Sequence, residues 1–148
     1  MDIIALILGL TTQPPVYAQP FPVVAVVQKV EKPKPPEPKF SDPIHENLYE
    51  WGNCTKYVAD KLSIPNSWGN AATWLPTAEY EGYVTGSKPK VGSVAWFEPG
   101  WSLGHVAYVE EVYPDGSFLI SEMNVEGLNV ISSRVITREG VRFIYGKI

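Results

Sequence analysis

The sequence is poor in the side chains that build cross-links and metal centres. Its 148 residues include one cysteine, Cys54, and two histidines, His45 and His105. A lone thiol cannot form an intrachain disulfide, and no cysteine and histidine residues have the spacing of a structural zinc site. The chain also has no glycine-rich phosphate loop, and no apolar run near the roughly 20 residues of a membrane helix. The sequence therefore predicts neither a disulfide scaffold, a zinc module, a P-loop enzyme nor a stable membrane span.

The composition instead indicates one globular domain. Hydrophobic residues make up 45% of the chain and charged residues 19%, which suffices for one hydrophobic core. Of the five tryptophans, we expect Trp51, Trp68, Trp74 and Trp96 to pack in that core. The net charge is −4, and there is no basic stripe that would bind nucleic acid. We expect a monomer without a nucleic-acid partner.

Residues 1–18 predict a signal peptide or a hydrophobic segment. The apolar run Ile3 to Leu10 has the length of a signal-peptide core, and the small residues of Val16-Tyr17-Ala18 predict cleavage after Ala18. Met1-Asp2 brings no positive charge before the run, so the segment could also be a misassigned start or the end of a longer anchor. With cleavage, the protein would be secreted or associated with the cell envelope.

Residues 19–43 predict a proline-rich linker. The stretch "KVEKPKPPEPKF" alternates charge with proline, which favours an extended polyproline II spacer. A disordered tail left after signal cleavage is an equal alternative. We place the folded domain at residues 44–148.

The domain reads as α+β, with helix first and strands later. Residues 54, 57, 58, 61 and 62 share one helical face, and Pro65 ends that helix. Strand-like runs follow at 92–97, 104–113, 117–125, 129–137 and 141–148, separated by turn residues. Their short connections predict an antiparallel meander rather than a parallel nucleotide-binding sheet.

Cys54 falls in the first turn of the predicted helix, where the helix dipole and free backbone N–H groups stabilise a thiolate. The same N–H groups could serve as an oxyanion hole, and Gly52 lets a substrate approach the backbone. Taken alone, a single cysteine is more often a small buried side chain. A base near Cys54 is needed before the sequence favours a nucleophile over a buried side chain.

His105 is the better candidate for that base. His45 lies in the proline-rich approach to the domain and is expected to be solvated, whereas His105 opens a strand directly after Gly104. If Asp115-Gly116 forms a two-residue turn, Asn124 lies diagonal to His105 and Glu122 lies one pair farther along the same face. A shift of one residue in register would send both side chains to the other face.

The motifs "WGNCTKYV", "WGNAATW", "PKVGSVAWF", "GHVAYVEEV" and "ISEMN" occur in that order. They resemble the CHAP domain, the cysteine, histidine-dependent amidohydrolase/peptidase family with a papain-like fold. The resemblance implies N-terminal helices packed on an antiparallel sheet of about five to six strands. It implies peptidoglycan as the substrate, cleaved by an amidase or an endopeptidase without a cofactor.

By position, the resemblance implies Cys54 as nucleophile, His105 as general base, and Glu122 and Asn124 as partners of His105. Asn53 stands where many members carry glutamine, and could donate to an oxyanion. Trp101, in a glycine-rich loop, is a candidate to line the groove. Some members bind calcium, but only Asp42, Glu46 and Glu50 are available here, and no metal is predicted. An inactive wall-binding or assembly module, and a thiol amidase that acts on a non-wall peptide, are the alternatives.

Overall fold

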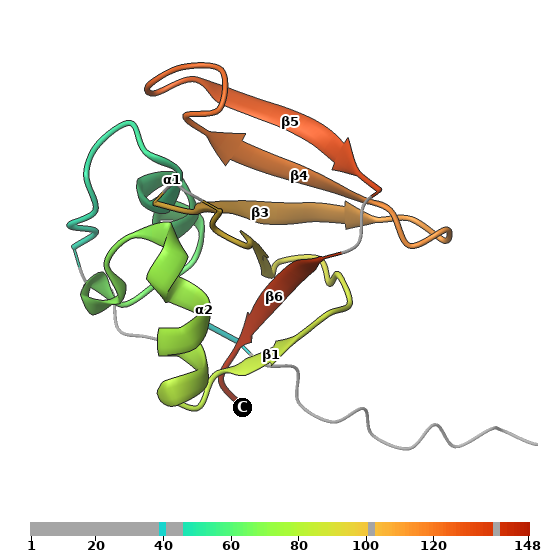
Figure 1. Ribbon diagram of the computed structural model, residues 1–148, viewed down its shortest axis with the longest axis horizontal. Helices are drawn as coiled ribbons and strands as arrows, with labels where there is room; N and C mark the ends of the chain where they lie inside the picture. The colour runs from blue at the N-terminus through green and yellow to red at the C-terminus, as the bar shows by residue number, and fades with distance from the viewer. Residues whose placement is uncertain (1–38, 41–45, 101–102, 138–139) are drawn as a thin grey trace, which may run out of the picture. The chain divides into compact units, whose positions relative to one another are not determined.

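The fold places helices before strands, as the sequence predicts (Figure 1). A computed structural model describes residues 39–40, 46–100, 103–137 and 140–148 of the chain. The helical elements are α1 (Cys54–Lys61), the 3-10 helix η1 (Asn66–Trp68) and α2 (Ala71–Tyr80). The strands are β1 (Val84–Gly86), β2 (Val94–Phe97), β3 (His105–Val112), β4 (Phe118–Met123), β5 (Ile131–Ile136) and β6 (Val141–Gly146). Within the described ranges, no helix combines the length and the apolarity needed to cross a membrane.

The six strands form one antiparallel sheet in the order β1-β6-β2-β3-β4-β5. The predicted meander is correct for β2 to β5. It is wrong for β6, which pairs with β2 and not with the preceding β5. The sheet curls, so that β4 and β6, which are not neighbours in it, bring Phe118 and Phe143 into edge contact with ring centroids 5.2 Å apart. This curl brings the end of β5 near the start of β6, and a short connection can therefore join two strands that do not pair.

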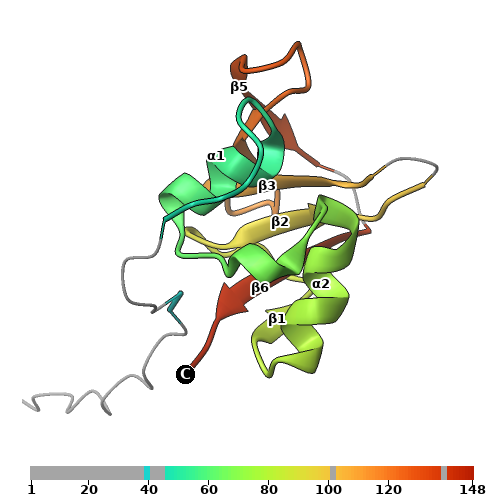
Figure 2. The same ribbon diagram turned by 90° about the vertical axis from the view of Figure 1, so that its left-hand side faces the viewer.

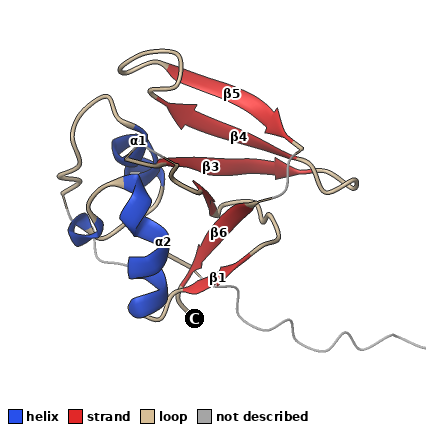
Figure 3. Cartoon of the chain, viewed as in Figure 1, coloured by secondary structure: helices blue, strands red, loops and turns tan. Residues whose placement is uncertain are grey.

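The two faces of the sheet bury two separate hydrophobic clusters. Helices α1 and α2 lie on one face (Figures 2 and 3), where Val106 of β3 and Trp96 of β2 pack against them. The Trp96 indole N–H donates to the Ala71 carbonyl over 2.9 Å, which ties the start of α2 to the sheet. On the other face, Ala107, Val109 and Phe143 belong to a cluster that the curled strands enclose themselves. His105 and Glu122 belong to this second face, at one end of the strands.

Trp51 departs from its prediction as a core residue. Trp68, Trp74 and Trp96 are buried as predicted, but Trp51 is 64% exposed. It precedes Gly52, whose φ of 84° turns the chain immediately before α1, so the indole points away from the core.

Part of the predicted linker packs on the domain. The predicted segments 1–18 and 19–43 otherwise lie outside the described residues, but the backbones of Lys39 and Lys147 exchange two hydrogen bonds of 2.9 Å. Phe40 packs against the helix-side cluster. A side chain at Gly146 would collide with the backbone of Lys39, since its Cβ would lie 2.4 Å from the Lys39 carbonyl carbon.

The β3–β4 hairpin has a different register from the predicted one. Its loop has three residues, Pro114 to Gly116, because Tyr113 N–H donates to the Ser117 carbonyl over 2.8 Å and Gly116 takes a φ of 86°. This shifts the pairing of β3 with β4 by one residue from the predicted register. A bulge between Val109 and Glu111 then shifts it by one more, so that Tyr108 pairs with Ser121.

Each shift of one residue moves the side chains of β4 to the other face of the sheet relative to β3, so the second shift reverses the first. The loop alone would have placed Glu122 on the face opposite His105, and the bulge returns it to the same face. Continued by one pair from Tyr108 and Ser121, the register sets Glu122 opposite Ala107, diagonal to His105. The prediction that Asn124 is the diagonal neighbour is therefore wrong, and Glu122 takes that place.

Candidate active site

Cys54 is the first residue of α1, as predicted. The preceding Asn53 is extended, and its side chain makes no capping hydrogen bond, so the first-turn N–H groups are not occupied by it. Burial by itself raises the pKa of the Cys54 thiol. The hydrogen bond and charge of His105, and the backbone groups of Val106 and Thr55, outweigh this and lower the pKa below its usual value. The site therefore favours a thiolate.

His105 opens β3 and shares hydrogen bonds with both Cys54 and Glu122. Its Nε2 lies 2.8 Å from Glu122 Oε2, which leaves Nδ1 as the ring nitrogen for the thiol. Burial disfavours the charged ring, but the hydrogen bonds and charges of Cys54 and Glu122 raise the pKa of His105 to about 9. The two shifts together favour a thiolate beside an imidazolium.

Gly104 fixes where β3 begins. It has a φ of 81°, and a Cβ at this position would lie 2.5 Å from the backbone nitrogen of Ala72. The Ala72 N–H donates to the Leu103 carbonyl over 2.8 Å, so the loop is held against the first turn of α2. Only glycine allows this close approach, which sets the position of the following histidine.

Glu122 is fully buried, with 0% of its surface exposed. Burial raises the pKa of its carboxyl, but hydrogen bonds and charges from His105 and Arg134 lower it below its usual value. The Arg134 Nε donates to Oε1 over 2.7 Å, and its Nη2 donates to Oε2 over 3.2 Å. The sequence reasoning missed Arg134, although it lies two residues from Ser132, which pairs with Glu122, and therefore on the same face.

Asn124 contacts Asn53 rather than His105. It has a φ of 66° just beyond β4, and its Nδ2 donates to Asn53 Oδ1 over 2.8 Å. Since that oxygen is the acceptor of the Asn53 amide, the contact fixes the orientation of the Asn53 side chain directly before Cys54.

A groove of about 420 Å³ passes over Cys54. The structure brings Cys54, His105, Asn53 and Asn124 together in its lining. The remaining lining residues are Leu48, Tyr49, Glu50, Thr55, Asn66, Gly69, Asn70, Ala71, Leu103 and Gly104. Glu122 lies behind His105 and not in this lining. Two sequence candidates, Trp101 and His45, and also Asp42, lie outside the described residues.

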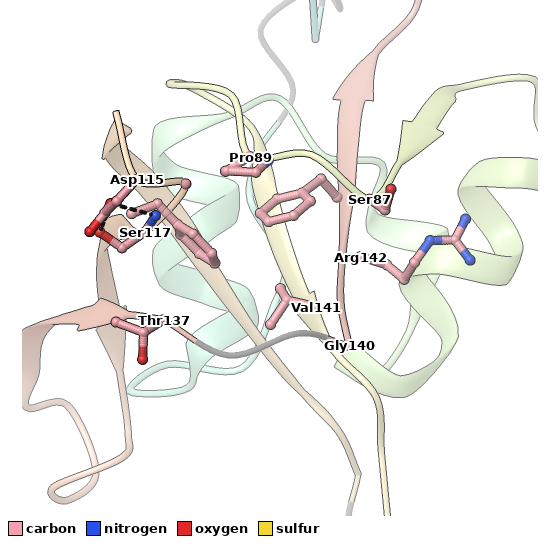
Figure 4. Close-up of a pocket in the computed structure, with 11 residues that line it drawn as sticks. Ser87, Pro89, Asp115, Ser117, Thr137, Gly140, Val141 and Arg142 are labelled. Atoms are coloured by element: carbon pink, nitrogen blue, oxygen red, sulfur yellow. Dashed lines mark hydrogen bonds between the residues drawn. The ribbon is translucent and has the colours of Figure 1, made fainter. Parts of the chain in front are cut away.

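A larger hollow of about 700 Å³ lies at the hairpin end of the sheet (Figure 4). Ser87, Asp115, Thr137 and Arg142 contribute to its lining, and the Asp115 carboxylate accepts hydrogen bonds from the backbone and hydroxyl of Ser117. Neither Cys54 nor His105 lines it. The smaller groove is the one that carries reactive side chains. In the described part of the chain, no three His, Cys, Asp or Glu residues are grouped so that they could hold a metal ion.

Comparison with known proteins gives the family of this chain. The sequence model of the CHAP domain matches residues 44–124, which is more than half of the chain. The chain belongs to the CHAP domain family. The α+β fold and the family expected from the motifs are both confirmed.

Relatives of this CHAP domain occur in Staphylococcus aureus. Staphylococcal secretory antigen SsaA of strain NCTC 8325 is 45% identical over 94 residues, which cover 62% of this chain and 36% of the relative. "Probable autolysin LDP" of the same strain is 42% identical over 99 residues, covering 64% of this chain and 35% of that protein. The chain thus spans little more than a third of the length of these relatives.

A solved structure shares the fold. The crystal structure of an N-acetylmuramoyl-L-alanine amidase from Staphylococcus aureus has a TM-score of 0.62 to this chain and is 38% identical to it. The match covers 65% of this chain and 30% of the amidase chain.

Proposed function

We propose that this CHAP domain hydrolyses an amide bond of bacterial peptidoglycan, with Cys54 as nucleophile and His105 as acid and base. The observation that carries the proposal is the chain of contacts from Cys54 through His105 to the buried Glu122. The names of the relatives, an autolysin and a muramoyl-alanine amidase, support a wall amide as the substrate.

The reaction would proceed by acyl transfer. The Cys54 thiolate attacks the amide carbonyl carbon and forms a tetrahedral oxyanion. The His105 imidazolium gives its proton to the leaving nitrogen, the carbon–nitrogen bond breaks, and a thioester remains. Neutral His105 then takes a proton from water, whose oxygen attacks the thioester and releases the acid and the thiolate.

Glu122 and Asn124 would have separate tasks in this mechanism. Glu122 stabilises the imidazolium by its charge and holds the ring through Nε2. Asn124 orients the amide of Asn53, and a fixed Asn53 amide beside the nucleophile is suited to donate to the oxyanion. The Asn53 role rests on its place in the groove next to Cys54.

The test is digestion of purified peptidoglycan with the full chain, followed by mass spectrometry of the released muropeptides. A new amino terminus with a matching free carboxyl identifies the cleaved amide, and separates amidase from endopeptidase activity. Absence of any released fragment, with intact binding to the wall, would support the inactive wall-binding module instead. Cleavage of a free peptide but not of the wall would support the non-wall amidase.

Asn124→Gly is expected to lower kcat about tenfold to a hundredfold with both limbs of the pH–rate profile unmoved. Glycine accepts the positive φ, so the variant removes the contact with Asn53 without backbone strain. Asn129→Gly is the matched control, because Asn129 has a φ of 63° in the same connection. Equal loss in both variants, or a shifted limb in Asn124→Gly, would contradict the role given to Asn124.

We also propose that the protein is exported. The secretory antigens among the relatives support this, together with the apolar run and the Val16-Tyr17-Ala18 site. Amino-terminal sequencing of protein recovered from the culture medium is expected to begin near Gln19. An intact Met1 on that material would contradict cleavage.

A further inference from the structure

The carboxylate of Glu122 is held by two cationic groups, of which the mechanism above uses only His105. The second is Arg134 on β5, whose guanidinium holds both oxygens: Nε bonds Oε1 over 2.7 Å and Nη2 bonds Oε2 over 3.2 Å. Oε2 is also the atom that faces His105 Nε2 over 2.8 Å. Among the described residues, Oε1 is bonded by Arg134 and not by His105, and this fixes the direction in which Oε2 points.

The contact with Arg134 matters because Glu122 is buried. A carboxylate with 0% exposure is costly to ionise without compensating partners, and it then takes up a proton instead. A protonated Glu122 would no longer stabilise an imidazolium by charge. In the part of the chain that the structure describes, the ionisable groups that act on Glu122 are His105 from β3 and Arg134 from β5. Cys54 of α1 acts on the carboxylate through the His105 ring.

The position of Arg134 in the sheet suits it to support Glu122 rather than to contact substrate. It pairs with Ile120, one position along the same face from the Glu122 and Ser132 pair. Its guanidinium carbon lies 5.7 Å from the centre of the Phe97 ring, and that ring lies 5.5 Å from the ring of His105. Arg134 is not among the residues that line the groove.

We propose that Arg134 is a positioning residue of the active site, which keeps Glu122 ionised and aims its Oε2 at His105. The inference rests on the proposed hydrolysis for its catalytic consequence, but its physical claim concerns Glu122 alone. Arg134, on the edge strand β5, is then the fourth residue in the series of contacts formed by Cys54, His105 and Glu122.

The direct test is the titration of the Glu122 side-chain carboxyl by carbon-13 NMR in the full chain, with Glu122→Gln to assign the resonance. In Arg134→Gln the midpoint is expected to rise by one pH unit or more, since the carboxylate loses a cation and two hydrogen bonds. Arg134→Lys keeps the charge but not the two-point contact, and an intermediate midpoint is expected.

Arg142→Gln is the matched control. Arg142 lies on β6 of the same sheet with a similarly exposed side chain, 43% against 49% for Arg134, and pairs with Glu79 over 3.0 Å. Its removal is expected to leave the Glu122 midpoint unchanged. An unchanged midpoint in Arg134→Gln, or an equal shift in Arg142→Gln, would overturn the proposal. If Arg134→Gln does not fold, an unchanged midpoint in Arg134→Lys overturns it in the same way.

Kinetics provide the second readout. In Arg134→Gln, kcat is expected to fall about tenfold, with KM unchanged and the acidic limb of the pH–rate profile moved to higher pH. A rise in KM alone would mean that Arg134 binds substrate, and would overturn the positioning role. The carboxyl titration needs no substrate. Failure of the wild type to release muropeptides would therefore refute the proposed function while the NMR result still decides the role of Arg134.

Discussion

Cys54→Ser is expected to lower kcat on peptidoglycan by at least about a thousandfold while the chain stays folded. His105 lowers the pKa of the thiol and so favours a thiolate, whereas a serine hydroxyl ionises only at far higher pH. With a pKa of about 9, His105 is already protonated at neutral pH in the wild type, so it is poised as an acid rather than as a base. The measurement is the rate of muropeptide release at several pH values.

Cys54→Ala serves as the matched control for this variant, because it removes the nucleophile without adding a hydroxyl. Both variants should show a circular dichroism spectrum like that of the wild type and a cooperative thermal transition. Activity above a few per cent of the wild type in either folded variant would remove Cys54 from the mechanism.

Glu122→Gln should move the alkaline limb of the pH–rate profile to lower pH, by on the order of one unit. The direction of this shift in the alkaline limb follows from the contacts of His105. Its pKa is raised to about 9 in part by the Glu122 carboxylate, so removing that negative charge lets the imidazolium deprotonate more readily. Glutamine keeps an oxygen that can accept from Arg134, so the substitution changes charge more than shape.

A second measurement makes this prediction independent of turnover. Cys54 is the chain's one cysteine, so the rate of alkylation by iodoacetamide reports on this thiol alone. His105→Ala is the reference variant without the imidazolium, and Glu122→Gln should lie between it and the wild type. An unmoved alkaline limb together with wild-type alkylation would show that the carboxylate is not coupled to His105.

The sequence predicted the parts of the site that depend on local patterns. The helical spacing from Cys54 onward set this cysteine at a helix start, and the glycine before His105 marked the start of a strand. Cys54 and His105 can both be placed from the sequence, because the residues next to each of them determine its local conformation.

The partners of His105 depended on features that the local sequence does not reveal. The loop at Pro114 to Gly116 and the bulge near Glu110 each shift the register by one residue, and only their combination puts Glu122 beside the histidine. Glu110 itself is held by Ser121 and Lys61, from β4 and α1, so the bulge is stabilised by residues distant in sequence. Arg134 was missed for the same reason, since its role depends on the pairing of β5 with β4.

The half-buried Cys54 thiol, whose pKa is lowered, also determines how the protein would respond to oxidants. A thiolate with partial access to solvent is the form that peroxides convert to sulfenic acid. The usual intramolecular rescue is attack by a second thiol, which this sequence does not contain. Reversal would then depend on a small-molecule thiol entering the groove, and further oxidation to the sulfinic acid would be permanent. The arrangement that lowers the pKa of this thiol thus also leaves it without a second thiol in this sequence to reverse its oxidation.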